Sequence, residues 1–316
     1  MQPTPKSLFE PGSPSRGLAK IGLAEKRFPL KTRREVPAIS QLWKRSKQLC
    51  WDAADIPFDT FDRAKYSKEQ LDAARLAWSR RAWTEYTGII ESPAMLIRLA
   101  LDGQAPIEAK FVLAAKVFEE ARHCEASFML AEAMGGYVPE PPPGDAIVKI
   151  VVAGFRDRLA FNPEVSTEAA IAGWHVISEG VAVDIFAARY RACTEPVTKE
   201  VLRLILQDEV RHVNVGWAYL EHRIPEMSAA EVKAVEDVVV DIMQNVEMKG
   251  IHSMCLLPKD LVSQLQDAEK IAAAAGLGFC TVEEEHEVFS KNVRNLRARF
   301  QKLGISLPLY PELQEV

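Results

Sequence analysis

Several features that would place this chain in a common protein class are missing from its sequence. No apolar run reaches the roughly 18 residues of a membrane span, and the first residues lack the pattern of a secretion signal. The cysteines form no Cys-x-x-Cys pair and are odd in number: Cys50, Cys124, Cys193, Cys255 and Cys280. These absences argue against a disulfide framework or a zinc site. They predict a cytoplasmic protein with reduced thiols and no membrane span.

Long alternating runs of β-branched residues, which would indicate a sheet, are missing too. From residue 67 on, the chain is instead typical of long helices separated by short turns. Each long helix opens with a capping serine or with proline near its first turn, and the expected ranges are 67–101, 106–135, 166–193 and 196–224. The pattern predicts an all-α fold in which these four helices form the core of one bundle.

Additional helices are expected around this core. One covers 146–159, and capping-box patterns open two more, at Ser228 with Glu231 and at Thr281 with Glu284, with another helix between them. We therefore expect a helical domain over 50–316, preceded by a basic arm over 1–49.

Charge is divided unevenly between the arm and the domain. The arm carries 11 Lys and Arg against 3 Glu, a charge of +8, which leaves −13 for the rest of a chain whose total is −5. Its first 35 residues are expected to be a solvated, disordered tail. The acidic domain gives no support for a nucleic-acid partner.

One short pattern occurs twice, in the second and the fourth expected helix. Residues 119–123 read EEARH and residues 208–212 read DEVRH, which share the template acid, Glu, any residue, Arg, His. Positions i and i+3 of a helix lie on one face, so the Glu and the His of each copy can bind one metal ion together. The predicted ligand pairs are Glu120 with His123 and Glu209 with His212.

A dimetal bundle also needs one carboxylate from each of the other two helices, at the height of these pairs. Antiparallel helices joined by a short turn place residues at equal height when they are equally far from the turn. By that count Glu85 matches Glu120 in the first hairpin, and Glu179 matches Glu209 in the second. Glu91 is the alternative to Glu85, but it would lie about 9 Å too low at about 1.5 Å per residue.

The predicted site holds four glutamates and two histidines. Oxygen-rich ligands with two imidazoles and no thiolate suit iron or manganese. A metal-binding histidine needs an acceptor for its other ring N–H, and an acid precedes each motif glutamate. We expect the acids to serve the histidines crosswise, each neutralised by a motif arginine: Asp208 with His123, Glu119 with His212, and Arg122 and Arg211 beside the acids.

These residues resemble the ferritin-like diiron-carboxylate superfamily over about residues 51–253. The stretches WDAADI at 51–56, EARH at 120–123, SEG at 178–180 and DEVRH at 208–212 are most similar to the ligand-binding oxidases related to the ribonucleotide reductase small subunit. The spacing of the four glutamates also resembles that of bacterial arylamine N-oxygenases. The resemblance implies a ferritin-like four-helix bundle with additional helices. It also implies two iron ions, or one manganese and one iron, with dioxygen as co-substrate.

Some positions depart from these relatives. Ser127 stands where the reductase subunit has its radical tyrosine, so no phenol is present there. Gly88 and Trp174 stand where the ligand-binding oxidases have a valine and a tyrosine that become cross-linked, and Ile205 stands where the N-oxygenases have an additional histidine ligand. We expect Gly88, Trp174, Ile205 and the nearby His175 at a substrate cavity. His175 either serves the metals or is a buried histidine bonded to backbone.

These features predict an enzyme that uses dioxygen on a small, mainly apolar or aromatic substrate. The reaction class is hydroxylation, N-oxygenation or desaturation, and an external electron donor and a homodimer are expected. Two alternatives are a radical-generating subunit of the reductase type and a ferritin-type protein that oxidises ferrous iron.

Overall fold

The computed structural model describes residues 35–102, 105–141, 158–256 and 259–313. Within these ranges the regular structure is helical and contains no strand, which confirms the all-α prediction. Residues 1–34 of the expected arm and most of the expected 146–159 helix lie outside the described residues. The last part of the arm forms helix α2 (Pro37–Gln48), which packs on two helices of the bundle.

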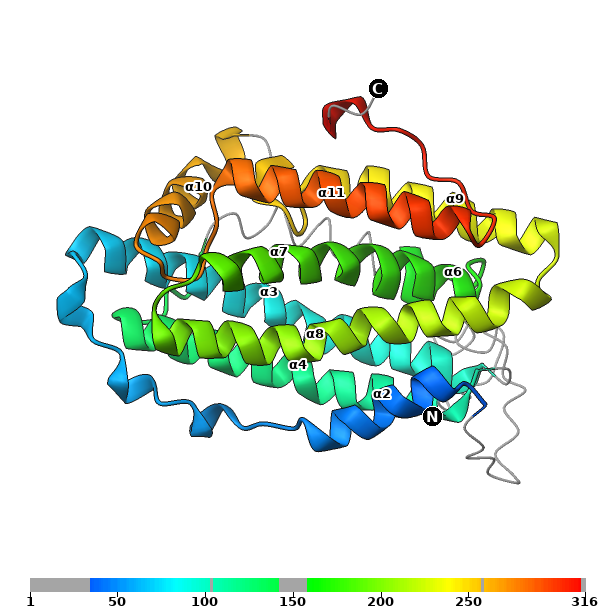
Figure 1. Cartoon of the computed structure of the whole chain (residues 1–316), viewed down its shortest axis with the longest axis horizontal. Coiled ribbons are helices and arrows are strands. Elements are labelled where there is room, and N and C mark those ends of the chain that lie inside the picture. The colour runs from blue at the N-terminus through cyan, green and yellow to red at the C-terminus, as the bar shows by residue number, and fades with distance from the viewer. Residues whose placement is uncertain (1–34, 103–104, 142–157, 257–258, 314–316) are drawn as a thin grey trace, which may run out of the picture.

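The long helices begin and end close to where the capping signals place them (Figure 1). The Ser67 hydroxyl accepts a hydrogen bond from the backbone N–H of Gln70, and the Ser166 hydroxyl accepts one from Ala169. These bonds satisfy N–H groups that have no partner within the first helical turn. The bounds are α3 Lys68–Leu101, α4 Ile107–Met134, α6 Thr167–Ile171, α7 Glu179–Ala192 and α8 Pro196–Arg223.

Two antiparallel hairpins form the bundle, α3 with α4 and α7 with α8, and α4 also packs against α8 (Figure 1). Helix α2 lies across α4 and α8, and α10 (Lys259–Ala274) packs along α3. Helix α9 (Ala229–Asn245) packs on the segment that precedes α7, and α11 (Val282–Gln301) packs on α7 itself. Both predicted capping boxes are present, at the starts of α9 and α11.

Short 3₁₀ turns lie between these helices and near the two ends of the described chain. Their bounds are Ala53–Asp55, Phe58–Thr60, Arg63–Lys65, Ile224–Glu226, Glu247–Lys249, Met254–Leu256 and Pro311–Leu313.

The third long helix is not uniform, whereas the sequence predicted one helix from Ser166 to Cys193. Residues Ala172–Ser178 form a π-helical segment between α6 and α7, and the backbone N–H of Glu179 bonds the carbonyl of Trp174, five residues earlier. A π-turn changes which side chains face a given neighbour, and such segments occur frequently at functional sites.

The helical run Thr167–Ala192 is long and apolar enough to cross a membrane by length and composition alone. However, 89% of its most apolar window is buried inside the protein. A helix that is covered on all sides by other helices has the same composition. Its burial beneath α8, α9 and α11 therefore accounts for its hydropathy.

Candidate metal centre

The six predicted ligand side chains come together inside the bundle and are buried. Their nitrogen and oxygen atoms form two overlapping clusters, and within each cluster the atoms lie within 4.8 Å of one another. One cluster consists of Glu85, Glu120, His123 and Glu209, and the other of Glu120, Glu179 and His212. Two clusters that share a glutamate and have one histidine each match two neighbouring metal positions. Glu91 belongs to neither.

His123 is oriented so that one ring nitrogen faces the carboxylates and the other faces an acid. Its Nδ1 lies 3.3 Å from Glu209, 3.7 Å from Glu120 and 3.8 Å from Glu85. Its Nε2 lies 3.3 Å from Oδ2 of Asp208, which accepts the N–H at that position. Burial lowers the pKa of His123, but the surrounding carboxylates raise it well above its usual value. Because Asp208 accepts the hydrogen bond at Nε2, the ring presents Nδ1 to the position that a metal ion would occupy.

His212 has the same orientation in the second cluster. Its Nδ1 lies 3.0 Å from Glu209, 3.8 Å from Glu120 and 3.9 Å from Glu179. Its Nε2 lies 2.8 Å from Oε2 of Glu119. Although burial lowers the pKa of His212, Glu209 and Glu119 raise it to about 9.

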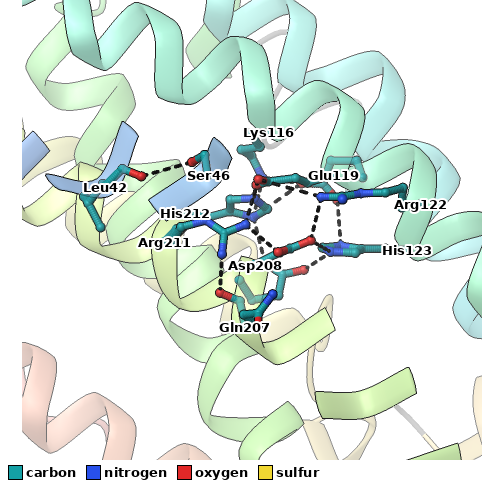
Figure 2. Close-up of polar contacts among 12 residues, drawn as sticks. Leu42, Ser46, Lys116, Glu119, Arg122, His123, Gln207, Asp208, Arg211 and His212 are labelled. Carbon is teal, nitrogen blue, oxygen red and sulfur yellow. Dashed lines mark hydrogen bonds and ion pairs between the residues drawn. The ribbon is translucent and has the colours of Figure 1, made fainter. Parts of the chain in front are cut away.

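The acids and arginines of the two motifs are arranged crosswise, as the sequence predicted (Figure 2). Arg122 donates a hydrogen bond of 3.1 Å to Asp208, and Arg211 donates one of 2.7 Å to Glu119. Arg211 also bonds Asp208. Burial raises the pKa values of both acids, but the histidine hydrogen bonds and the arginines lower them below the usual values. Both acids are therefore carboxylates and can accept from the imidazoles.

Trp51 extends this network toward the surface and was not predicted to have a role. Its indole N–H donates to Oδ2 of Asp208 at 2.8 Å, and its ring stacks on His123 with 6.2 Å between centroids. Arg122 donates to its backbone carbonyl at 2.8 Å. Trp51 reaches the site from the segment before α3, so no helical periodicity could have revealed the contact.

Lys116 is a second residue that the sequence reasoning missed. It lies on α4 four residues before Glu120 and is 1% exposed. Its ammonium group donates to Glu120 and, at 2.6 Å, to Glu179. It lies 3.4 Å from Nδ1 of His212. Burial lowers the pKa of Lys116, but the two glutamates raise it far above its usual value, so the side chain is an ammonium ion. The same contact lowers the pKa of Glu120 to about 2, against the effect of burial.

Gly88 leaves room for one of the candidate ligands. A Cβ atom at this position would lie 2.9 Å from Oε2 and 3.0 Å from Cδ of Glu120. The sequence predicted Gly88 at a substrate cavity, and the space beside Gly88 is occupied by the carboxylate of Glu120. An alanine here would push against a candidate metal ligand.

A cavity of about 70 Å³ opens directly on the carboxylates. Gly88 and Trp174 line it, as expected, and the indole N–H of Trp174 donates to Glu179 at 2.9 Å. His175 and Ile205 do not line this cavity, contrary to the prediction. The π-helical segment turns residue 174 rather than residue 175 toward Glu179, and His175 is buried beside α8, where a Cβ on Gly216 would lie 2.7 Å from that of His175.

Arg81 and His252 give the cavity a polar side that the sequence did not predict. Arg81 pairs with Glu85 and lies over the ring of Phe186. Nδ1 of His252 lies 2.9 Å from the buried Glu247. Burial lowers the pKa of His252, but Glu247 raises it above its usual value. Arg81 and His252 also line a smaller neighbouring cavity of about 40 Å³.

The residues fit a pair of divalent metal ions. All donors are carboxylate oxygens or imidazole nitrogens, with no thiolate among them. Nδ1 of His123 makes no well-aligned hydrogen bond within the described part of the chain, although it is buried among carboxylates. Glu85, Glu120, His123 and Glu209 would hold one ion, and Glu179 and His212 would hold the other together with the shared Glu120.

The helical ferritin-like fold and the buried carboxylate–histidine cluster together indicate which class of protein this chain resembles. No protein-family model matches the sequence, and no curated protein matches it either. Among solved structures, an R2-like ligand-binding oxidase with an aerobically reconstituted metal cofactor, after photoconversion, has a TM-score of 0.63 and 16% identity. That comparison covers 84% of this chain and 94% of the other.

An R2-like ligand-binding oxidase with an aerobically reconstituted Mn/Fe cofactor is similar to the same degree. Its TM-score is 0.59 at 17% identity, over 84% of this chain and 93% of that chain. At this level of identity the likeness establishes the fold, which is that of the R2-like ferritin-like proteins. Activity and substrate have to be inferred from the site itself.

Proposed function

We propose that this protein is a dioxygen-activating oxidase or oxygenase with a dinuclear centre of two iron ions or of manganese and iron. The observation that carries the proposal is the convergence of four glutamates and two histidines, all buried, beside a small cavity that the four glutamates line. Bound there, two redox-active ions would supply two electrons to dioxygen. The Mn/Fe cofactor of the structurally similar oxidase supports the choice of metals.

The protein's own groups orient the ligands and exclude water. Asp208 and Glu119 accept the Nε2 protons of the two histidines, so that both Nδ1 atoms face the metal positions. Arg122 and Arg211 keep those acids ionised. Burial strengthens these interactions because little water is present to screen them.

The cavity indicates a small substrate of mixed polarity. At about 10–15 Å³ for each water, its 70 Å³ would hold only a handful of water molecules. Trp174, Ala182 and Ile251 provide apolar contacts, and Arg81 and His252 provide polar side chains. We therefore add a polar group to the small apolar or aromatic substrate that the sequence suggested. Hydroxylation, N-oxygenation and desaturation are all compatible with such a ligand.

Dioxygen consumption by the metal-loaded protein tests this function. Protein loaded without oxygen with Fe²⁺, or with Mn²⁺ and Fe²⁺, should consume dioxygen faster than the same metal free in buffer. Glu120→Ala should abolish the excess, and Glu125→Ala, an exposed position on the same helix, should keep it. A protein that holds two metal ions but consumes no dioxygen beyond the metal blank would contradict the proposal.

A radical-generating subunit is the second candidate, and Trp51 is the observation that favours it. The hydrogen bonds from Trp51 to Asp208 and from Asp208 to His123 connect an oxidisable indole to the metal site. Trp51→Phe removes the donor and keeps the ring. If Trp51 carries electrons to the site, this variant should slow reduction of the metal centre without changing metal content. Unchanged reduction kinetics would leave Trp51 with only a structural part.

The remaining predictions about the protein's surroundings follow from the same proposal. An oxidase of this kind needs an external electron donor, and we expect a homodimer in the cytoplasm. The five cysteines are all free thiols in the structure, which agrees with a reducing compartment. A ferritin-type protein would also oxidise ferrous iron, but it would do so without a dependence on an organic substrate.

A further inference from the structure

Lys116 differs from the motif arginines in where its charge lies. The motif arginines donate to the outer acids, whereas the Lys116 ammonium bonds two candidate metal ligands directly. Arg81 also pairs with a candidate ligand, but with one alone, Glu85 of the first cluster. The corresponding position of the second motif, four residues before its glutamate, is Ile205. The two halves of the site are therefore not equivalent.

The contacts of Lys116 belong to one of the two metal positions. Its ammonium bonds Glu120 and Glu179 and lies 3.4 Å from Nδ1 of His212. These three residues are the whole of the second ligand cluster. Of the first cluster, only the shared Glu120 is bonded to Lys116.

An ammonium ion and a metal ion require the same lone pairs from these ligands. The ammonium donates N–H groups to oxygen atoms that a metal would bind, and its charge opposes a second cation placed beside it. A buried lysine is also strongly destabilised when its carboxylate partners are taken away, because no water replaces them. Metal binding at this position therefore requires Lys116 to give up its bonds.

We propose that Lys116 is a built-in competitor for the second metal position, so that the two ions bind in a fixed order. The first ion binds at Glu85, Glu120, His123 and Glu209. The second binds at Glu179 and His212 only when the Lys116 ammonium withdraws. This inference rests on the proposed dimetal site, and it provides a way to place two different metals in a defined sequence.

Metal titration of Lys116→Met tests the order of binding. Methionine keeps much of the length and volume of lysine but carries no charge. In the wild-type protein, calorimetric titration should show that Mn²⁺ binds in two steps of unequal affinity. Lys116→Met should tighten the second step at least tenfold and change the first by less than threefold. Lys110→Met is the matched control, because Lys110 lies on the same helix and bonds the backbone carbonyls of Ala100 and Asp102.

A second measurement uses the unmodified chain, in case Lys116→Met does not fold without metal. With diamagnetic Zn²⁺, the side-chain NMR signals of Lys116 should move little with the first equivalent, which would bind the other oxygen of Glu120, and should shift mainly with the second. Two equal binding steps in the wild-type protein, an unchanged or weaker second step in Lys116→Met, or a Lys116 shift that is complete at the first equivalent would each overturn the proposal. Two-step binding without dioxygen consumption would defeat the proposed oxidase function alone, because the order of binding is measured without oxygen.

Discussion

Replacement of Gly88 by alanine should lower metal affinity without lowering folding stability. Metal affinity depends on the position of the Glu120 carboxylate, whereas stability depends on the helix propensity of residue 88. A Cβ at this position would lie 3.0 Å from Cδ of Glu120 and 2.9 Å from its Oε2, whereas carbon atoms in good contact lie about 3.5–4.0 Å apart. The carboxylate would have to move by roughly half an ångström, which is the tolerance within which a working site must hold its groups. The clash is with the far end of a flexible side chain, so the fold can absorb it.

The expected effects of Gly88→Ala therefore have opposite signs. Alanine is better than glycine inside a helix by about 1 kcal/mol, so the metal-free protein should resist urea as well as the wild type or slightly better. Metal affinity should fall about 10- to 100-fold, the range typical of disturbed metal-site geometry. The assays are denaturant unfolding of the metal-free protein and calorimetric titration with Mn²⁺.

Gly180→Ala is the matched control on α7. A Cβ there would lie 3.8 Å from Leu296, which is an ordinary contact. This variant should gain stability in the same way and bind metal with unchanged affinity. Wild-type metal affinity in Gly88→Ala would show that Glu120 is not held against Gly88 in the loaded protein, and would refute the reasoning.

Two further predictions concern the ligand register and the radical chemistry. Glu85→Gln should abolish dioxygen reactivity because Glu85 faces His123. Glu91→Gln should reduce that reactivity only slightly because Glu91 is in neither ligand cluster. The reverse pattern in stopped-flow assays would show that the predicted register of the first helix pair is wrong. Dioxygen added to the reduced protein should give no sharp tyrosyl signal in electron paramagnetic resonance and no new intrachain cross-link, because Ser127 and Trp174 stand at the positions where the resemblance implies phenols. A stable tyrosyl radical in the unmodified chain would instead favour the radical-generating subunit.

The helix boundaries could be predicted because their causes are local. Serine caps, proline at the first turn and glycine at the end act within one helical turn, so Ser67 and Gly135 mark α3 and α4 in the sequence itself. The meeting of the six ligand side chains was predictable for a related reason. Helical periodicity fixes which residues share a face, and equal distances from a turn fix their height.

The π-helical segment could not be predicted in this way, and it determines which residues line the cavity. Nothing in residues 172–178 distinguishes a π-turn from an α-turn, yet it brings Trp174 rather than His175 toward Glu179. The contacts of Trp51 and His252 were also hidden, because both residues reach the site from segments outside the four-helix bundle. Only the fold brings such segments together.

Lys116 lies on a motif helix, at a position whose proximity to the metals helical spacing could have predicted. Four residues before Glu120 is the same face of α4, so helical spacing alone places its ammonium near the metals. Its sequence signal was the asymmetry between the two motif copies, with lysine in one and isoleucine in the other. Buried lysines are rare enough that only the structure shows which way this one points.

The most direct test of the central claim is the metal content of purified protein after loading with Fe²⁺ or Mn²⁺ and removal of loosely bound ions. Elemental analysis should find about two ions per chain in the wild type and in Glu125→Ala, as a bundle with two Glu-x-x-His motifs requires. The double variant Glu120→Ala with Glu209→Ala should lose both ions, because it removes the glutamate shared by the proposed metal positions and a second ligand of the first position. Full metal occupancy in that double variant, or no bound metal in the wild type, would contradict the dinuclear site.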